Sequence, residues 1–198
     1  CGGDGEIERI PGQVAYRCVH LDTGAIYRRK LYHFVSKKCF NIDGFGPKQI
    51  DLFLDNGLIA TYADIFTLKK GDIEVLPRMG EKSAINIIEA IEKSKKVDCA
   101  RLIFALSIPQ VGEETARDLS RVADGDIERL RNMSVGELSE VYGIGSVVAQ
   151  NVYDWFRNKK HTKEIDDVLE QVEVVKTKKT ANIGTLTGPF VGKTVVLT

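Results

Sequence analysis

The sequence predicts a mainly α-helical protein built from tandem helical repeats. Apolar residues recur at helical spacing along most of the 198 residues, and glycine-containing turns interrupt them at a regular interval. With 43 % hydrophobic and 28 % charged residues, the composition is that of a folded globular protein. No run of about 18 apolar residues is present, which excludes a membrane-spanning helix of that kind.

The 28 basic and 28 acidic residues balance, but their distribution along the chain is uneven. Residues 1–40 carry seven Lys or Arg and four Asp or Glu, residues 41–157 carry 14 and 19, and residues 158–198 carry seven and five. An acidic middle region does not attract nucleic acid through its overall field. If this region binds DNA, local backbone geometry must provide the contacts.

The four cysteines are Cys1, Cys18, Cys39 and Cys99, and they form no Cys-x-x-Cys pair. A complete zinc motif is therefore not visible within the chain. Cys39 and Cys99 lie in apolar segments of helical character, which predicts buried, reduced thiols. Nothing at the N-terminus resembles a secretory signal, so we expect a cytoplasmic protein.

Residue patterns on either side of the repeats predict further elements. Residues 13–18 alternate and predict a short strand, while residues 28–40 and 159–173 have the apolar spacing of helices. Residues 176–188 are polar and typical of a linker, and residues 193–198 are β-branched and apolar, as in a buried strand.

Four turns in the middle of the chain share one pattern, in which an apolar residue precedes a final glycine. They are residues 43–46, 77–80, 109–112 and 142–145, and their final glycines are 34, 32 and 33 residues apart. Four positions after each final glycine stands a small or apolar residue: Ile50, Ala84, Ala116 and Ala149. The pattern predicts two helices joined by a tight turn, repeated four times.

The glycines of these turns predict sites for anions. Glycine tolerates positive φ and leaves no side chain above the turn, while the apolar residue between the glycines anchors the turn inward. The following helix begins with N–H groups that no helical carbonyl accepts. A phosphate fits such a site without a basic side chain. This is the helix-hairpin-helix pattern, which holds the DNA backbone regardless of sequence.

The candidate DNA contacts are the turn glycines and two lysines: Gly44, Gly46, Lys48, Gly80, Lys82, Gly112, Gly143 and Gly145. The second and third turns carry Arg78 and Gln110 in place of the first glycine, so we expect these two hairpins to be tighter or distorted. Lys48 and Lys82 stand two residues after a final glycine, where an ammonium group can add a phosphate contact.

Other interpretations of the same pattern remain open. Ankyrin and tetratricopeptide repeats have a similar period, although neither of their sequence signatures is present. Residues 143–145 alone could belong to a dinucleotide-binding loop, but Val148 stands where that loop needs glycine. A single turn of this kind is often only a helix end, whereas four aligned turns favour the helix-hairpin-helix pattern.

Six segments of the chain carry a resemblance to a known family. They are HFVSKK at residues 33–38, IDGFG at 42–46, GEKSA at 80–84, LIFAL at 102–106, VGE at 111–113 and GKTVVLT at 192–198. In this order they resemble the C-terminal half of bacterial NAD-dependent DNA ligases. The resemblance implies a small zinc-finger-like segment over residues 1–27, a helix-hairpin-helix domain of four motifs over 28–174, a linker over 175–187 and the start of a BRCT domain over 188–198.

The zinc site that the resemblance implies is incomplete in this chain. Cys1 and Cys18 correspond to the second and third of four cysteine ligands, and the first would precede Cys1. The fourth falls near Thr23 and Gly24, and a surface role is favoured for the nearby His20. With two ligands matched, the sequence leaves zinc binding open and favours its absence, although a finger without metal persists where a neighbour buries it.

The chain also lacks the chemistry of the family it resembles. In that family a lysine in a Lys-x-Asp-Gly motif becomes adenylated, with NAD as the donor of AMP, and no such motif occurs here. His20, His33 and His161 are expected to be structural or exposed, so no catalytic residue is assigned. The resemblance implies a parent enzyme that uses NAD and magnesium in upstream domains, and a fragment that is inactive alone.

The expected partner is nicked double-stranded DNA, bound by a monomer without a membrane, in the bacterial cytoplasm at the nucleoid. The role implied is to hold the duplex so that the upstream site can act in replication and repair. Two alternatives stay open: a non-enzymatic helix-hairpin-helix protein that acts as a DNA-repair scaffold or binds junctions, and a helical repeat that binds protein.

Overall fold

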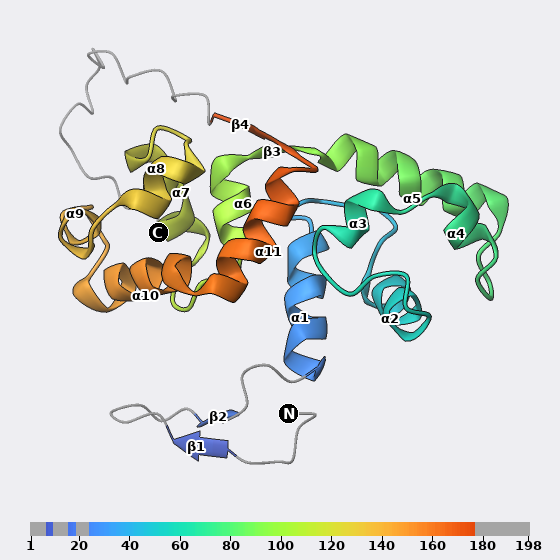
Figure 1. Ribbon diagram of the computed structural model, residues 1–198, viewed down its shortest axis with the longest axis horizontal. Helices are drawn as coiled ribbons and strands as arrows, with labels where there is room; N and C mark the ends of the chain where they lie inside the picture. The colour runs from blue at the N-terminus through green and yellow to red at the C-terminus, as the bar shows by residue number, and fades with distance from the viewer. Residues whose placement is uncertain (1–6, 10–15, 19–23, 177–198) are drawn as a thin grey trace, which may run out of the picture.

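Helices dominate the computed structural model, which describes residues 7–9, 16–18 and 24–176 (Figure 1). The helices are α1 (Gly24–Val35), α2 (Pro47–Asp55), α3 (Asp64–Thr67), α4 (Lys70–Glu74), α5 (Glu81–Ser94), α6 (Cys99–Ala105), α7 (Glu113–Val122), α8 (Ile127–Asn132), α9 (Val135–Ser139), α10 (Ser146–Arg157) and α11 (Lys159–Leu169). The strands are β1 (Ile7–Arg9), β2 (Tyr16–Cys18), β3 (Lys96–Asp98) and β4 (Glu173–Val175). The mainly α-helical fold predicted from the sequence is confirmed.

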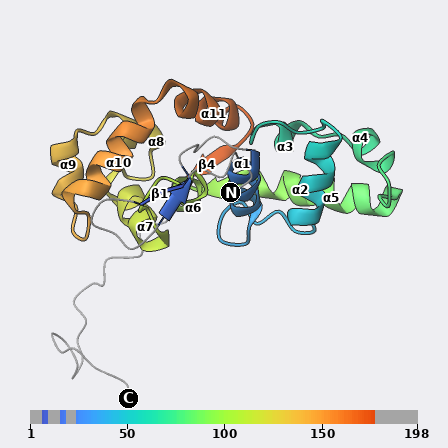
Figure 2. The same ribbon diagram turned by 90° about the horizontal axis from the view of Figure 1, so that it is seen from below.

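The helices form two halves, and α1 of the first half lies where the two halves meet (Figures 1 and 2). The first half contains α1 to α5, and the second contains β3, α6 to α11 and β4. Buried apolar side chains from both halves make up one continuous core. Phe34 of α1 stacks on Phe40 and Tyr62 at centroid distances of 4.2 and 4.4 Å. These aromatic contacts pack α1 against the rest of the first half.

α1 ends before the position that the apolar spacing predicts. The amide of Phe40 donates to the carbonyl of Phe34, and Asn41 has a φ of 52°, so the chain turns back over the helix end. Cys39 consequently lies in a turn and not in a helix, which corrects the sequence-based expectation. Cys99 is the first residue of α6, and both cysteines are free and fully buried, as predicted.

A parallel strand pair closes the second half. β3 pairs with β4 with Val97 opposite Val174, and the amide of Glu173 donates to the carbonyl of Lys95 at 2.7 Å. The sequence predicts a helix up to residue 173 and a linker from residue 175. The predicted helix end is wrong, because α11 ends at Leu169 and residues 173–175 form β4. The chain thus returns from α11 to the start of its own half.

The N-terminal strand prediction is confirmed in part. β2 covers the end of the predicted residues 13–18 and pairs antiparallel with β1. Cys1, His20 and Thr23 lie outside the described residues, as do the predicted BRCT strand and nearly all of the predicted linker. Among the residues that are described, no helix is long and apolar enough to cross a membrane.

Candidate nucleic-acid interface

The four predicted turns have one backbone geometry. In each, the apolar residue before the final glycine donates its amide hydrogen to a carbonyl three residues earlier. These bonds are Phe45 to Ile42 at 3.3 Å, Met79 to Leu76 at 3.1 Å, Val111 to Ile108 at 3.1 Å and Ile144 to Val141 at 3.0 Å. We call these turns hairpins one to four, and they lead into α2, α5, α7 and α10.

The residue before the apolar one has positive φ in every hairpin: 70° at Gly44, 65° at Arg78, 63° at Gln110 and 82° at Gly143. The expected distortion of hairpins two and three is therefore wrong. The residues before Arg78 and Gln110 are Pro77 and Pro109. Each proline is the second residue of a four-residue turn whose third residue has positive φ, and turns of this type favour proline at that second position. Proline presets the turn, and this offsets the cost of a side chain at positive φ.

The final glycine of each hairpin is needed neither for backbone conformation nor for space. Gly46, Gly80, Gly112 and Gly145 have φ between −96° and −78°, which any residue adopts. A Cβ on Gly80, Gly112 or Gly145 would meet no atom within 4 Å, and on Gly46 it would meet only the Gln49 side chain at 3.8 Å. Their lack of a side chain instead leaves the start of the following helix open to an approaching molecule.

These four helix starts differ from others in the described chain. None of the four final glycines provides a side-chain hydrogen bond to the first turn of its helix. By contrast, a side-chain oxygen caps α6, α8, α9 and α11, from Asp98, Asp126, Ser134 and Asn158 respectively. The short helices α3 and α4 also begin without a side-chain cap, at Ala63 and Lys69. The longer helices α2, α5, α7 and α10 combine open amides with a glycine before them, so the hairpins can bind an anion.

The small residue four positions after each final glycine fixes the direction of the following helix. The amide of Ile50, Ala84, Ala116 or Ala149 donates to the carbonyl of its glycine at 2.9–3.0 Å, and all four side chains are fully buried. Phe45, Val111 and Ile144 are buried beneath their hairpins, while Met79 is half-buried. The core thus sets each hairpin rigidly, with its open amides outward.

The charges around the hairpins are unequal. Lys48 and Lys82 are exposed, and in the described part of the chain neither takes part in an ion pair. The first turns of α2 and α10 contain no acidic residue, whereas α5 begins with Glu81 and α7 with Glu113 and Glu114. The helix N-termini at hairpins one and four therefore attract an anion more strongly than those at hairpins two and three.

Two features near the hairpins have no local signal in the sequence. At hairpin four, Tyr142 and Val147 are exposed on either side of the turn, with Tyr142 96 % accessible. Beside hairpin three, Lys38 of the first half reaches Glu113 of the second at 2.8 Å. Only the packing of α1 against α6 brings these two residues together, so neither sequence segment alone predicts the contact.

The described structure does not test the predicted metal ligands. Cys18 is the last residue of β2, and Cys1 and Thr23 lie outside the described residues. Within the described ranges no group of three or more His, Cys, Asp or Glu residues could hold a metal ion. The zinc prediction therefore stays a prediction.

Four hairpins in two successive pairs define a tandem helix-hairpin-helix protein, a class that binds double-stranded DNA without reading its sequence. Two family models match the chain. Residues 40–93 match the SAM-like helix-hairpin-helix tandem, and residues 101–165 match the helix-hairpin-helix motif. The first range contains hairpins one and two and the second contains hairpins three and four, so the two matches correspond to the two structural halves.

Proposed function

We propose that this chain holds duplex DNA at a nick, as the DNA-binding part of an NAD-dependent DNA ligase. The observation that carries the DNA contact is the set of four helices that each begin after a glycine, whereas α6, α8, α9 and α11 begin with a side-chain cap. Open amides at four fixed positions suit the repeated phosphates of a backbone. Such contacts position a duplex but carry no base information.

The ligase assignment is supported by the resemblance of segments that form the hairpins and their supporting helices. HFVSKK ends α1, IDGFG forms hairpin one and VGE forms hairpin three. In the proposed protein the adenylated lysine, NAD and magnesium belong to upstream domains. The hairpins place the nick before that active site, and positioning of this kind lowers the barrier to sealing. The protein would work as a monomer at the bacterial nucleoid.

Fluorescence polarisation with a labelled duplex of about 30 base pairs, nicked or intact, tests DNA binding. The variant Gly46→Val with Gly145→Val should bind at least about tenfold more weakly, because two side chains then cover the open amides. A matched control is Gly71→Val with Gly136→Val, since these glycines also have room for a side chain but lie in α4 and α9. Unchanged affinity in the first variant would contradict the hairpin assignment.

A second measurement tests the ligase role. In the parent protein, the same hairpin variant should keep NAD-dependent adenylation and lose nick sealing, because the two steps use different domains. If the parent lacks a Lys-x-Asp-Gly motif and does not adenylate itself, the chain is instead part of a non-enzymatic repair or junction-binding protein. If the wild-type chain binds no DNA even at low salt, the repeats serve a protein partner.

A further inference from the structure

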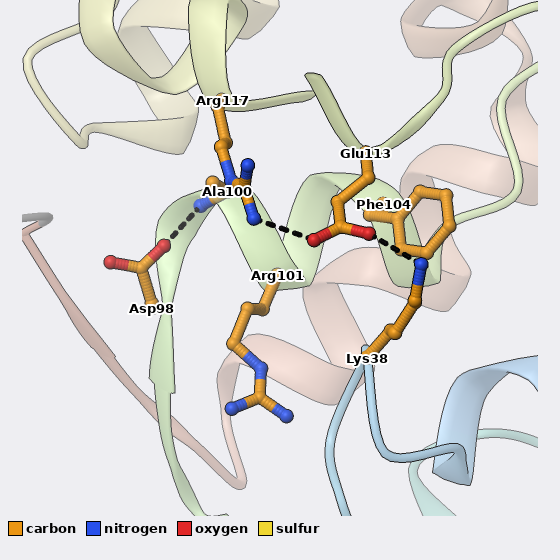
Figure 3. Close-up of a pocket in the computed structure, with 7 residues that line it drawn as sticks. All are labelled: Lys38, Asp98, Ala100, Arg101, Phe104, Glu113 and Arg117. Carbon is orange, nitrogen blue, oxygen red and sulfur yellow. Dashed lines mark hydrogen bonds and ion pairs between the residues drawn. The ribbon is translucent and has the colours of Figure 1, made fainter. Parts of the chain in front are cut away.

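A cavity of about 260 Å³ lies at the junction of the two halves, beside hairpin three (Figure 3). Three cationic residues line it, namely Lys38 from the turn after α1, Arg101 from α6 and Arg117 from α7. Asp98 and Glu113 also line it. Asp98 is engaged at its own helix start, where its carboxylate accepts from the amide of Ala100 at 2.9 Å.

Glu113 lies between Lys38 and Arg117, while the guanidinium of Arg101 points away from it (Figure 3). One carboxylate oxygen lies 2.8 Å from Lys38 Nζ, and the other accepts from Arg117 at 2.6 Å. Lys38, and more weakly Arg117 and Arg101, hold the pKa of Glu113 below its usual value, so the carboxylate stays charged. In the free protein, the anion bound by Lys38 and Arg117 is therefore the carboxylate of Glu113.

We propose that this cavity is a binding site for a DNA backbone phosphate, in which the Glu113 carboxylate holds the phosphate position until DNA arrives. The proposal rests on the DNA-binding function above and adds a specific site to it. The ligand class is a phosphodiester of duplex DNA. Lys38 and Arg117 are the residues that would bind it, one from each half.

The chemistry of the partners supports the exchange. A guanidinium and an ammonium group that bind a carboxylate can bind a phosphodiester with the same donors. The Glu113 side chain is 34 % exposed, so it can rotate toward water without opening the core. The Lys38 side chain is 69 % exposed and the Arg117 side chain 50 %, so both are accessible to a duplex.

The site also accounts for the acidic start of α7. An acidic residue directly after Gly112 competes with phosphate at hairpin three, as Glu81 does directly after Gly80 at hairpin two. Displacement of Glu113 removes that competition, frees Lys38 and releases one of the two carboxylates that pair with Arg117. The first turn of α7 then keeps one acidic residue, Glu114, whereas the first turns of α2 and α10 have none.

A simpler role for Glu113 predicts the opposite result. If its ion pair with Lys38 only ties the two halves together, removal of the charge loosens the DNA-binding surface and weakens binding. If Glu113 occupies a phosphate position, removal of the charge strengthens binding. The sign of the change in affinity therefore separates the two roles.

The test is polarisation with the nicked duplex across a range of salt concentrations. Glu113→Gln should bind about three- to tenfold more tightly than the wild type, because the competing charge is gone. Glu114→Gln is the matched control, since Glu114 pairs with Arg117 but not with Lys38 and is 80 % exposed. An equal gain in both variants would show a general charge effect and overturn the site, as would unchanged or weaker binding by Glu113→Gln.

Lys38→Ala gives an independent arm. It should weaken binding and lower the slope of log affinity against log salt by about one, as expected for one lost phosphate contact. Lys93→Ala is the control, because Lys93 lies on α5 with a side chain 80 % exposed and pairs with Glu89 of the same helix. If Lys38→Ala behaves like its control, the site is wrong. Absence of wild-type DNA binding would instead overturn the proposed function itself.

Discussion

Arg101 binds the carbonyl oxygen of Cys39, 62 residues earlier in the chain, through its Nε at 2.7 Å. The same guanidinium donates to the carbonyl of Lys37 at 2.6 Å. These two carbonyls flank Lys38, so one side chain of the second half fixes the backbone that presents Lys38 to Glu113. His33 adds a contact at the same junction, with its Nε2 2.9 Å from the carbonyl oxygen of Phe104.

Arg101→Ala should lower the free energy of unfolding by about 2–3 kcal/mol, because two carbonyls lose a charged donor. Urea denaturation measures the change. Arg121→Ala is the control, since Arg121 is 72 % exposed and pairs with Asp118 on its own helix. The control should cost less than about 0.5 kcal/mol. Similar losses in both variants would show that the Arg101 contact does not join the halves.

Gly145→Asp should separate stability from DNA binding. An aspartate at this helix start can accept from the open amides of α10, so stability should stay the same or rise by a few tenths of a kcal/mol. The same carboxylate occupies the anion position, and affinity for DNA should fall about tenfold or more.

Asn158→Asp provides the comparison for this variant. Asn158 already caps α11 by accepting from the amide of Lys160 at 3.0 Å, and it lies away from the hairpins in sequence. This variant creates the same residue at a helix start that is already capped, and DNA affinity should change by less than about twofold. Equal losses of affinity would point to net charge and not to the hairpin.

The positive-φ positions make a prediction about stability alone. Gly143 has a φ of 82°, so Gly143→Ala should cost about 1–2 kcal/mol. Gln110 has a φ of 63°, so Gln110→Gly should be neutral or stabilise by up to about 1 kcal/mol. Thermal or urea unfolding of both variants checks the opposite signs. A stabilising Gly143→Ala would exclude the turn geometry described for hairpin four.

The buried thiols predict a dependence of stability on alkaline pH. Burial raises the pKa of Cys39 and of Cys99 to about 11, above the value of about 8.5 for a free thiol. As pH rises between these values, the unfolded state loses protons before the folded state does, so the free energy of unfolding should fall. The double variant Cys39→Ala with Cys99→Ala should show a shallower fall over that window.

Alkylation measures the same property directly. At about pH 8 the two thiols should resist iodoacetamide in the folded protein and react in denaturing urea, because only the thiolate is nucleophilic. Peptide mapping by mass spectrometry assigns each modified cysteine. Rapid labelling of Cys99 in the folded protein would show that α6 does not remain packed in solution.

The sequence predicts the hairpins well because their determinants are local. The glycine, the apolar anchor and the small residue four positions later all act within one turn, as the bond from Ala149 to Gly145 illustrates. The expected distortion at Arg78 and Gln110 was wrong because a nearby proline sets the turn as effectively as glycine sets it elsewhere.

The contacts between segments far apart in the sequence could not be predicted in the same way. β3 and β4 each have three residues, too few for a periodic pattern, and their partners are far apart in the sequence. The sequence around Arg101 and Lys38 does not indicate their partners, because an isolated basic residue is usually solvated at the surface. The contacts of Arg101 and Lys38 come from the packing of α1 against α6, which only the three-dimensional structure reveals.

The parallel pair β3–β4 has a mechanical consequence. The first half joins β3 at its beginning, and the chain continues from the end of β4, so tension along the chain pulls the two strands past each other in opposite directions. In this shear geometry the hydrogen bonds between β3 and β4 are loaded at the same time and not one after another. The load crosses directly from one strand to the other, and hairpins three and four lie in a loop of chain that the force bypasses.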